Sequence, residues 1–415
     1  MPAASARPLV RRLQKPDAVA TATGSPSTAL VLSGGGARGA YAVGVLAGMH
    51  AILGGLRSRF DLFTGTSVGA IHAADFAANA AKDDLGVTQL IRRYEELRLR
   101  THLRPHLPRG RRHDWSLIDP RPFEKIVRHA IPWDSLHRNI RDGLVRGLIV
   151  SGLRVSDGRT TTFAELAPGT ELVMTHDPRR DAVFGPITAD HVLASAALPL
   201  LFPSRRIEDT YYCDGGLRFN TPMAPAIRAG AQRLVVIALR QGRPAPDTGI
   251  EHYPKPFFLL GKILDALLLD PIEYDLHVLD RLNHMLAVME KTMPEPALEQ
   301  VRAVLESERG LPYRQIQTLV FRPSTDLGVL AGTYVRSQQP ARREGLAARL
   351  FIHQVGALGD RVEADFVSFL LFDGGFARLL IDLGRRDAMA CAEEIRAFFG
   401  VTSRRPTLHA VNGGR

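Results

Sequence analysis

Cysteine is scarce in this chain, which has 415 residues and two cysteines, Cys213 and Cys391. So few cysteines exclude the disulfide framework on which small secreted scaffolds depend. A low count is typical of proteins that work in a reducing compartment. We therefore expect a cytoplasmic protein, either free or peripheral to a membrane.

Long apolar runs are also missing. No stretch reaches the roughly 18 apolar residues that a membrane-spanning helix needs. Residues 1–28 mix Ala, Pro, Ser, Thr and Arg without an apolar core segment, which is unlike a secretory signal peptide. We expect a disordered leader here, and a basic docking arm is the alternative.

Acidic residues are outnumbered, with 43 Asp and Glu against 53 Lys and Arg and a formal net charge of +10. This excess favours anionic partners, namely phospholipid surfaces, nucleic acid or acidic substrates, and charge alone does not choose among them. The most basic run, residues 97–113, is typical of a solvated surface or of a patch for anionic head groups. The length predicts roughly two or three domains.

A serine at the centre of a Gly-x-Ser-x-Gly pentapeptide organises the N-terminal half. Gly65, Ser67 and Gly69 stand between an apolar run at 60–63 and a helix-forming run at 70–78. Strand, tight turn and helix in this order are the setting of a nucleophile elbow, whose glycines remove side chains that would clash. The following helix N-terminus favours negative charge beside the serine. The pentapeptide alone is equally compatible with an ordinary glycine-rich loop.

A glycine-rich turn precedes this elbow at residues 33–40. It follows an apolar strand pattern at 29–32 and opens a buried helix pattern at 41–49. Such a turn presents backbone N–H groups at a helix N-terminus and holds negative charge. The Gly-Lys-Ser/Thr ending of a P-loop is absent, which argues against that nucleotide site.

Two other interpretations of the glycine turn compete. Gly34, Gly36 and Gly39 formally match the dinucleotide fingerprint, with Asp61 as a late acidic residue. The other interpretation is an oxyanion hole, formed by the N–H groups of Gly35 and Gly36 with Gly34 in the same loop. Because a candidate nucleophile follows in the next strand-turn-helix unit, the oxyanion hole is the better interpretation.

A carboxylate stands at a predicted strand end, in the sequence Asp214-Gly215-Gly216. Taken alone, an Asp-Gly turn is usually structural; a second Asp-Gly-Gly, at 373–375, lies among helical patterns and is interpreted as a turn. Ester cleavage needs a nucleophile, a base and an oxyanion hole. Ser67, Asp214 and the glycine turn fill these roles, and a dry site would raise the basicity of the carboxylate.

The combination resembles the patatin-like phospholipase family over residues 29–228, about half of the chain. Four motifs in order carry the resemblance: residues 34–39, 65–69, 194–203 and 214–216. Family members commonly have Ala where Val68 stands, a small departure.

The resemblance implies a Ser67–Asp214 dyad rather than a triad, a three-layer α/β/α sandwich, and lipid acyl hydrolase activity of the phospholipase A type without metal or cofactor. It implies a phospholipid or other acyl-ester lipid as partner, while nucleic acid is not expected and the oligomeric state is open. The motif-supporting residues are Arg38, Gly39, Gly65, Gly69, Gly215 and Gly216. Arg38 either fixes the glycine loop or meets a phosphate.

The expected organisation is a leader at 1–28, a patatin-like domain at 29–240 and a mainly helical C-terminal region at 241–415 of unassigned role. Within that region, the apolar helix pattern at 257–269 is a core helix, a lid or a membrane-contacting helix. Further strands are expected at 144–154, 170–176, 234–239 and 315–321.

Several alternatives stay open from the sequence. A histidine-based triad has candidates by order or proximity, without a distinguishing context for any: His72, His191, His252, His277, His284 and His353. Other functions are an esterase or thioesterase on non-phospholipid acyl groups, a lipid-binding scaffold with a vestigial site, and a nucleotide-binding protein. Head group, acyl length and regiochemistry have no signature in the residues.

Overall fold

The computed structural model describes residues 26–98, 101, 116, 118–218, 220–242, 271–337 and 364–401. The leader expected at 1–28 falls outside these ranges except for its last three residues, and Thr28 already belongs to the first strand. Most of the basic run at 97–113 and the whole apolar pattern at 257–269 also lie outside the described residues.

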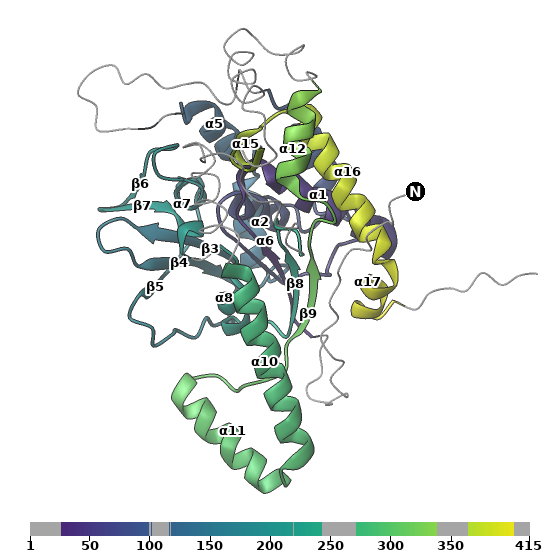
Figure 1. Ribbon diagram of the computed structural model, residues 1–415. Helices are drawn as coiled ribbons and strands as arrows, with labels where there is room; N and C mark the ends of the chain where they lie inside the picture. The colour runs from purple at the N-terminus through teal and green to yellow at the C-terminus, as the bar shows by residue number, and fades with distance from the viewer. Residues whose placement is uncertain are drawn as a thin grey trace, which may run out of the picture.

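A mixed β-sheet forms the centre of the molecule (Figure 1). Its described strands run in the order β5-β4-β3-β2-β1-β8-β9, and β7 pairs with β3 and β6. Neighbours from β3 to β9 along this order are parallel, while β4 and β7 run antiparallel to β3. The strands are β1 Thr28–Leu32, β2 Leu62–Gly65, β3 Gly147–Arg154, β4 Thr160–Leu166, β5 Arg180–Phe184, β6 Arg205–Ile207, β7 Thr210–Asp214, β8 Arg233–Ile237 and β9 Gln317–Phe321.

Helices cover both faces of this sheet. In the first part of the chain they are the 3-10 turn η1 Gly36–Gly39, then α1 Ala40–Leu53, α2 Val68–Ala78, α3 Val87–Glu95, α5 Arg121–Ala130, α6 Trp133–Arg141, α7 Ala189–Ser195, η2 Gly215–Leu217 and α8 Met223–Arg228. The later helices are α10 Pro271–Thr292, α11 Glu295–Arg309, α12 Leu327–Arg336, α15 Ala364–Leu370, α16 Gly374–Ala390 and α17 Ala392–Phe398.

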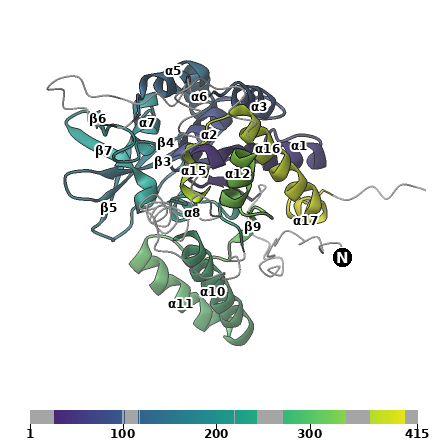
Figure 2. The ribbon, with the colours of Figure 1, turned by 45° about the horizontal axis from the view of Figure 1, so that its top comes forward.

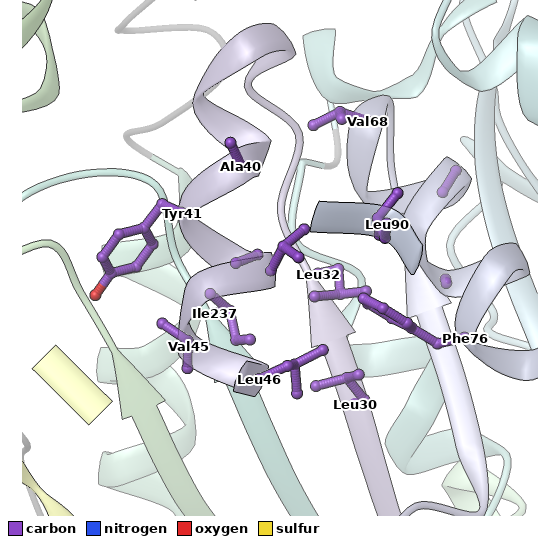
Figure 3. Packing of buried hydrophobic residues seen from close by; sticks show 14 of the residues in the cluster. Leu30, Leu32, Ala40, Tyr41, Val45, Leu46, Val68, Phe76, Leu90 and Ile237 are labelled. Carbon is purple, nitrogen blue, oxygen red and sulfur yellow. The ribbon is translucent and has the colours of Figure 1, made fainter. Parts of the chain in front are cut away.

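Alternation along β1 separates two hydrophobic cores. Leu30 and Leu32 face one core, which includes residues of α1 and α2 (Figure 3), whereas Ala29 and Val31 face a second core with α8 and α10. Successive side chains of a strand point to opposite faces, so a strand buried on both sides needs a layer of helices on each. The chain thus has the three-layer α/β/α sandwich that the resemblance implied.

The C-terminal region shares this framework. β9 extends the sheet by pairing in parallel with β8, and α16 packs along α1. Residues of α12, α15 and α16 belong to the same core as α1 and α2. The division expected at residue 240 therefore does not separate two hydrophobic cores, because the sheet and one core continue across it.

Small residues allow α1 and α16 to approach closely. A Cβ at Gly44 would overlap with the Ile381 carbonyl, and one at Gly384 would overlap with the Tyr41 carbonyl. The Tyr41 hydroxyl donates a 3.0 Å hydrogen bond to Asp387 Oδ2 across the same contact. Backbone contact at this distance holds the later helices firmly over the glycine turn that begins α1.

The strand expected at 170–176 is wrong, because this segment is irregular. Its carbonyl groups bind a side chain instead of a neighbouring strand: the Arg228 guanidinium donates to the carbonyls of Val173 and Met174, at 3.1 and 2.6 Å. The sheet edge is formed instead by β5, which pairs in parallel with β4.

The α10–α11 hairpin extends away from the sheet in both ribbon views (Figures 1 and 2). Glu273 near its base forms paired hydrogen bonds with Arg322, which follows β9. Of the helices that the structure describes, this long pair included, none has the length and apolar character to cross a membrane.

Candidate active site

Ser67 lies in the tight turn between β2 and α2. Its backbone has φ 56° and ψ −128°, a conformation that non-glycine residues rarely adopt. The flanking glycines are required sterically, because a Cβ at Gly65 would overlap with the Gly69 carbonyl and one at Gly69 would overlap with the Leu32 carbonyl. The strand-turn-helix setting predicted from the pentapeptide is therefore present, and the turn presents Ser67 at the N-terminus of α2.

Asp214, at the end of β7, is hydrogen-bonded to Ser67, which follows β2. The Ser67 hydroxyl donates a 2.7 Å hydrogen bond to Asp214 Oδ2, and the Gly216 N–H donates to Oδ1 at 2.7 Å. Asp214 ends β7, where it pairs with Gly152 of β3. A Cβ at Gly215 would overlap with the Ser151 carbonyl, so the Asp-Gly step lets β7 end tightly against β3.

Burial controls the protonation of this carboxyl. Asp214 is 1% exposed, and burial raises its pKa to about 7, while the hydrogen bonds from Ser67 and Gly216 act in the opposite direction. A carboxylate titrating near neutral pH is a far better proton acceptor than one in water. The arrangement is thus chemically able to take the hydroxyl proton of Ser67.

Residues at the C-terminal end of α7 form hydrogen bonds with the backbone of both Ser67 and Asp214. Ser195 Oγ accepts a 3.0 Å hydrogen bond from the Ser67 N–H and donates one of 2.6 Å to the Ser151 carbonyl. Two residues later, the Ala197 carbonyl accepts the Asp214 N–H at 2.9 Å. Ser195 lies within a motif of the resemblance, but the residues alone assigned it no role.

Asn220 holds the first glycine of the turn and was not singled out from the sequence. Its Oδ1 accepts the Gly34 N–H at 3.0 Å, and its Nδ2 donates to the Gly34 carbonyl at 3.2 Å. The Gly34 N–H is therefore occupied, which corrects its inclusion among oxyanion donors. Within the described residues, the N–H groups of Gly35 and Gly36 make no hydrogen bond.

Arg38 faces inward. It is 3% exposed, its Nε donates a 2.6 Å hydrogen bond to Ser368 Oγ, and its guanidinium lies 4.0 Å from the centre of the Phe369 ring. These contacts join Arg38, which belongs to the glycine turn, to two residues of α15. Gly39 brings this loop against α2, because a Cβ there would overlap with Val68.

An apolar cavity of about 310 Å³ begins beside the elbow. Val68, the residue after Ser67, lines it together with residues of α2, α3 and α5 and with Phe372. Its polar wall groups are already paired in part: His72 and Tyr94 share a 2.8 Å hydrogen bond, and Arg93 forms a 3.1 Å ion pair with Asp75. A mostly apolar cavity of this kind, lined by the residue that follows Ser67, suits a hydrocarbon chain.

None of the candidate histidines that the structure describes is hydrogen-bonded to Ser67 or Asp214. Burial lowers the pKa of His72 to about 3, and its Nε2 is bonded to Tyr94. His191 contacts Thr188 and the Phe163 ring, while His277 and His284 lie on α10. His252 and His353 fall outside the described residues.

The dinucleotide interpretation fails on geometry. Asp61 Oδ2 accepts the N–H of Thr28, at the start of β1, at 2.8 Å. The glycine turn follows the other end of β1. An acidic residue at the opposite end of the strand cannot contact a ribose whose phosphates lie on that turn.

Part of the chain matches a known protein family. Residues 30–227 match the family model of the patatin-like phospholipases. A curated relative, the cGAMP-activated phospholipase of Pseudomonas aeruginosa, is 29% identical over 204 residues, which are 48% of this chain and 56% of that protein. The chain thus spans little more than half of that relative's length.

Among solved structures, VipD from Legionella pneumophila aligns with 85% of this chain and 91% of its own, at 11% identity and a TM-score of 0.30, which is too low to support an argument. The family assignment rests on the sequence match. Residues 30–227, which contain the elbow, the glycine turn and Asp214, form a patatin-like phospholipase domain.

Proposed function

We propose that this protein is a serine lipid acyl hydrolase of the phospholipase A type, which cleaves fatty acyl esters in lipid catabolism. The observation that carries the proposal is the 2.7 Å hydrogen bond from the Ser67 hydroxyl to the buried Asp214 carboxylate. A strained serine on an elbow, bonded to a desolvated carboxylate, has the parts of a nucleophile and its base.

The reaction follows from these two groups. Ser67 Oγ bonds to the ester carbonyl carbon while Asp214 Oδ2 takes the hydroxyl proton. The proton passes to the leaving alcohol oxygen as the carbon–oxygen bond breaks, which leaves an acyl-serine. Water then attacks the acyl carbon and gives a proton to Asp214, which returns it to Ser67 Oγ as the fatty acid departs.

Negative charge on the attacked carbonyl oxygen needs hydrogen-bond donors. We assign this role to the N–H groups of Gly35 and Gly36, which start the η1 turn and make no hydrogen bond within the described residues. The N-terminus of α2, which begins at Val68, adds a favourable dipole. Removing one such donor in other enzymes costs roughly 10²- to 10³-fold in rate.

The acyl chain is proposed to occupy the cavity beside Val68. Val68 and Asp75 both line this cavity and lie seven residues apart on α2, so the cavity follows the helix for roughly 10 Å. The apolar walls accept a fatty chain and contribute about 25 cal/mol per Å² of apolar surface removed from water. An esterase or thioesterase acting on other acyl groups is the second candidate, since the cavity recognises the acyl part alone.

Fluorophosphonate labelling of the purified full-length chain tests the proposal. Wild type, Ser67→Ala, Asp214→Asn and the control Ser58→Ala are compared; Ser58 is an exposed serine that also has positive φ. Labelling should require Ser67, fall sharply in Asp214→Asn and be unchanged in the control. Because the Pseudomonas relative is named as cGAMP-activated, each reaction is run with and without cGAMP.

Substrate series then separate the candidates. Phospholipids and simple esters and thioesters of matched acyl length are compared, and a phospholipase predicts faster turnover of the phospholipids. Preference for the small esters would support the esterase candidate. Labelling that persists in Ser67→Ala would contradict the proposed dyad, because another residue would then be the reactive nucleophile. No labelling of wild type in any condition would favour a lipid-binding protein with a vestigial site.

A further inference from the structure

Residues beyond the matched domain lie directly against the glycine turn. The family match ends at residue 227, whereas α15 covers Ala364–Leu370 and packs on η1. Both ribbon views place α15 beside α12 and α16 and close to the beginning of α1 (Figures 1 and 2). The surroundings of the proposed oxyanion donors therefore include a segment that the family motifs do not describe.

Two contacts join α15 to the turn. Ser368 is fully buried, and its hydroxyl accepts the 2.6 Å hydrogen bond from Arg38 Nε. Phe369 is 2% exposed, its ring lies under the Arg38 guanidinium at 4.0 Å, and its carbonyl occupies the space that a Cβ at Gly36 would need. Gly36 has φ +56°, so this close approach is compatible with glycine alone.

The backbone of the turn is hydrogen-bonded locally, from the Arg38 N–H to the Gly35 carbonyl at 3.2 Å and from the Ala40 N–H to the Ala37 carbonyl. Further contacts come from the segments on either side of the turn. Asn220 holds Gly34 on one side, and α15 holds Gly36 and Arg38 on the other. The direction of the Gly35 and Gly36 N–H groups therefore depends on both supports, and donors stabilise a developing oxyanion only when they are held in place beforehand.

The residues that follow α15 make further contacts. Phe372, just after the helix, lines the acyl cavity, and its ring lies 6.1 Å from that of Phe123. Asp373 is the N-cap residue of α16, and its Oδ1 accepts hydrogen bonds from the N–H groups of Gly375 and Phe376 and from the Tyr334 hydroxyl. The segment is thus anchored between the cavity and the helix that packs on α1.

From these contacts we propose that Ser368 and Phe369 are positioning residues for the oxyanion loop and act through Arg38 and Gly36. The C-terminal region then completes the catalytic site rather than adding a separate module. This inference rests on the proposed acyl hydrolase function. It predicts that substitutions here lower kcat and leave KM nearly unchanged, because the carbonyl oxygen becomes charged only in the transition state.

The test is steady-state kinetics of the full-length chain, with the ester that is cleaved fastest in the substrate series as the substrate. Ser368→Ala removes the acceptor of Arg38 Nε, and Ser368→Thr keeps a hydroxyl. We expect kcat per active site to fall about 10- to 100-fold in Ser368→Ala with KM nearly unchanged, and to recover substantially in Ser368→Thr. Ser307→Ala is the control, because its hydroxyl bonds only within α11, to the Val304 carbonyl.

Active sites are counted by fluorophosphonate titration, so that unfolded protein does not lower the measured kcat. Arg38→Lys is a second variant, since lysine lacks the planar group that bonds Ser368 and stacks on Phe369. In a double-mutant cycle, Arg38→Lys with Ser368→Ala should be no slower than the worse single variant, because both changes remove the same support.

The inference is overturned if kcat per titrated site in Ser368→Ala stays within twofold of wild type, if the loss lies in KM alone, or if the two changes multiply independently. Should Ser368→Ala not fold, the kcat and KM of Arg38→Lys decide by the same criteria. Ester cleavage that is unaffected by Ser67→Ala would instead refute the proposed function, so the two failures are distinguishable.

Discussion

Replacing Asp214 by Asn should lower activity and raise stability in the same molecule. Asparagine keeps the shape of the side chain, and its Oδ1 can still accept the Gly216 N–H that now bonds Asp214 at 2.7 Å. Its amide cannot take the proton of Ser67. Loss of a general base typically costs about 10²- to 10⁴-fold in rate, or about 3 to 5 kcal/mol of transition-state stabilisation.

The gain in stability follows from the pKa of the buried carboxyl. Its value is 3.8 for an ordinary Asp and about 7 in the folded protein. Between these values the folded state holds a proton that the unfolded state has released, so the free energy of unfolding falls as pH rises, by up to about 4 kcal/mol. The asparagine has no such dependence, and its advantage should therefore be small near pH 4 and largest above pH 7.

Thermal unfolding at pH 5 and pH 8 measures this difference, with kcat/KM determined on the same samples. Ser307→Ala again serves as the control, because it changes an exposed hydroxyl far from the charge. Two results would refute the reasoning: an Asp214→Asn enzyme with near wild-type kcat/KM, or a melting-temperature advantage that does not grow between pH 5 and pH 8.

Two further predictions concern the same site, and a third concerns the charge of the whole chain. The kcat/KM of wild type should rise with pH through about 7, where Asp214 becomes a carboxylate; a profile flat from pH 5 to 8 would contradict this. Ser195→Ala leaves the Ser67 N–H without the acceptor at 3.0 Å, which costs about 1 to 3 kcal/mol, so fluorophosphonate labelling should slow roughly tenfold, and an unchanged labelling rate would argue that the elbow holds its shape alone. The net charge of +10 predicts binding to anionic vesicles that weakens with added salt, whereas equal, salt-indifferent binding to neutral vesicles would remove the electrostatic contribution.

Local turn chemistry could be recognised from the sequence. Gly65 is needed because its Cβ would overlap with the Gly69 carbonyl, a requirement that acts within the pentapeptide. The glycines at 69 and 215 could be recognised as parts of a turn motif, although the carbonyls that exclude a Cβ there, of Leu32 and Ser151, belong to distant segments. The buried strands β1 and β8 were likewise predicted from continuous apolar runs.

Long-range partners were decided by the tertiary structure alone. Ser67 meets Asp214 at a separation of 147 residues, and Arg38 meets Ser368 at a separation of 330. The motifs suggested Ser67 and Asp214 as nucleophile and base, and the family resemblance implied that they act as a dyad rather than a triad. No pattern indicated that Ser368 would contact the glycine turn. Contacts of this range depend on how sheet and helices pack, which single-sequence periodicity does not encode.

The wrong strand prediction has the same cause. Residues 170–176 have the composition of a strand, yet the Arg228 guanidinium binds carbonyls that a neighbouring strand would otherwise bind. Packing also decided that β9 of the C-terminal region joins the sheet and that α16 packs on α1. The sequence by itself determined the chemical groups and the turns that present them, whereas packing between distant segments decided their distances, burial and supports, because those properties belong to no single segment.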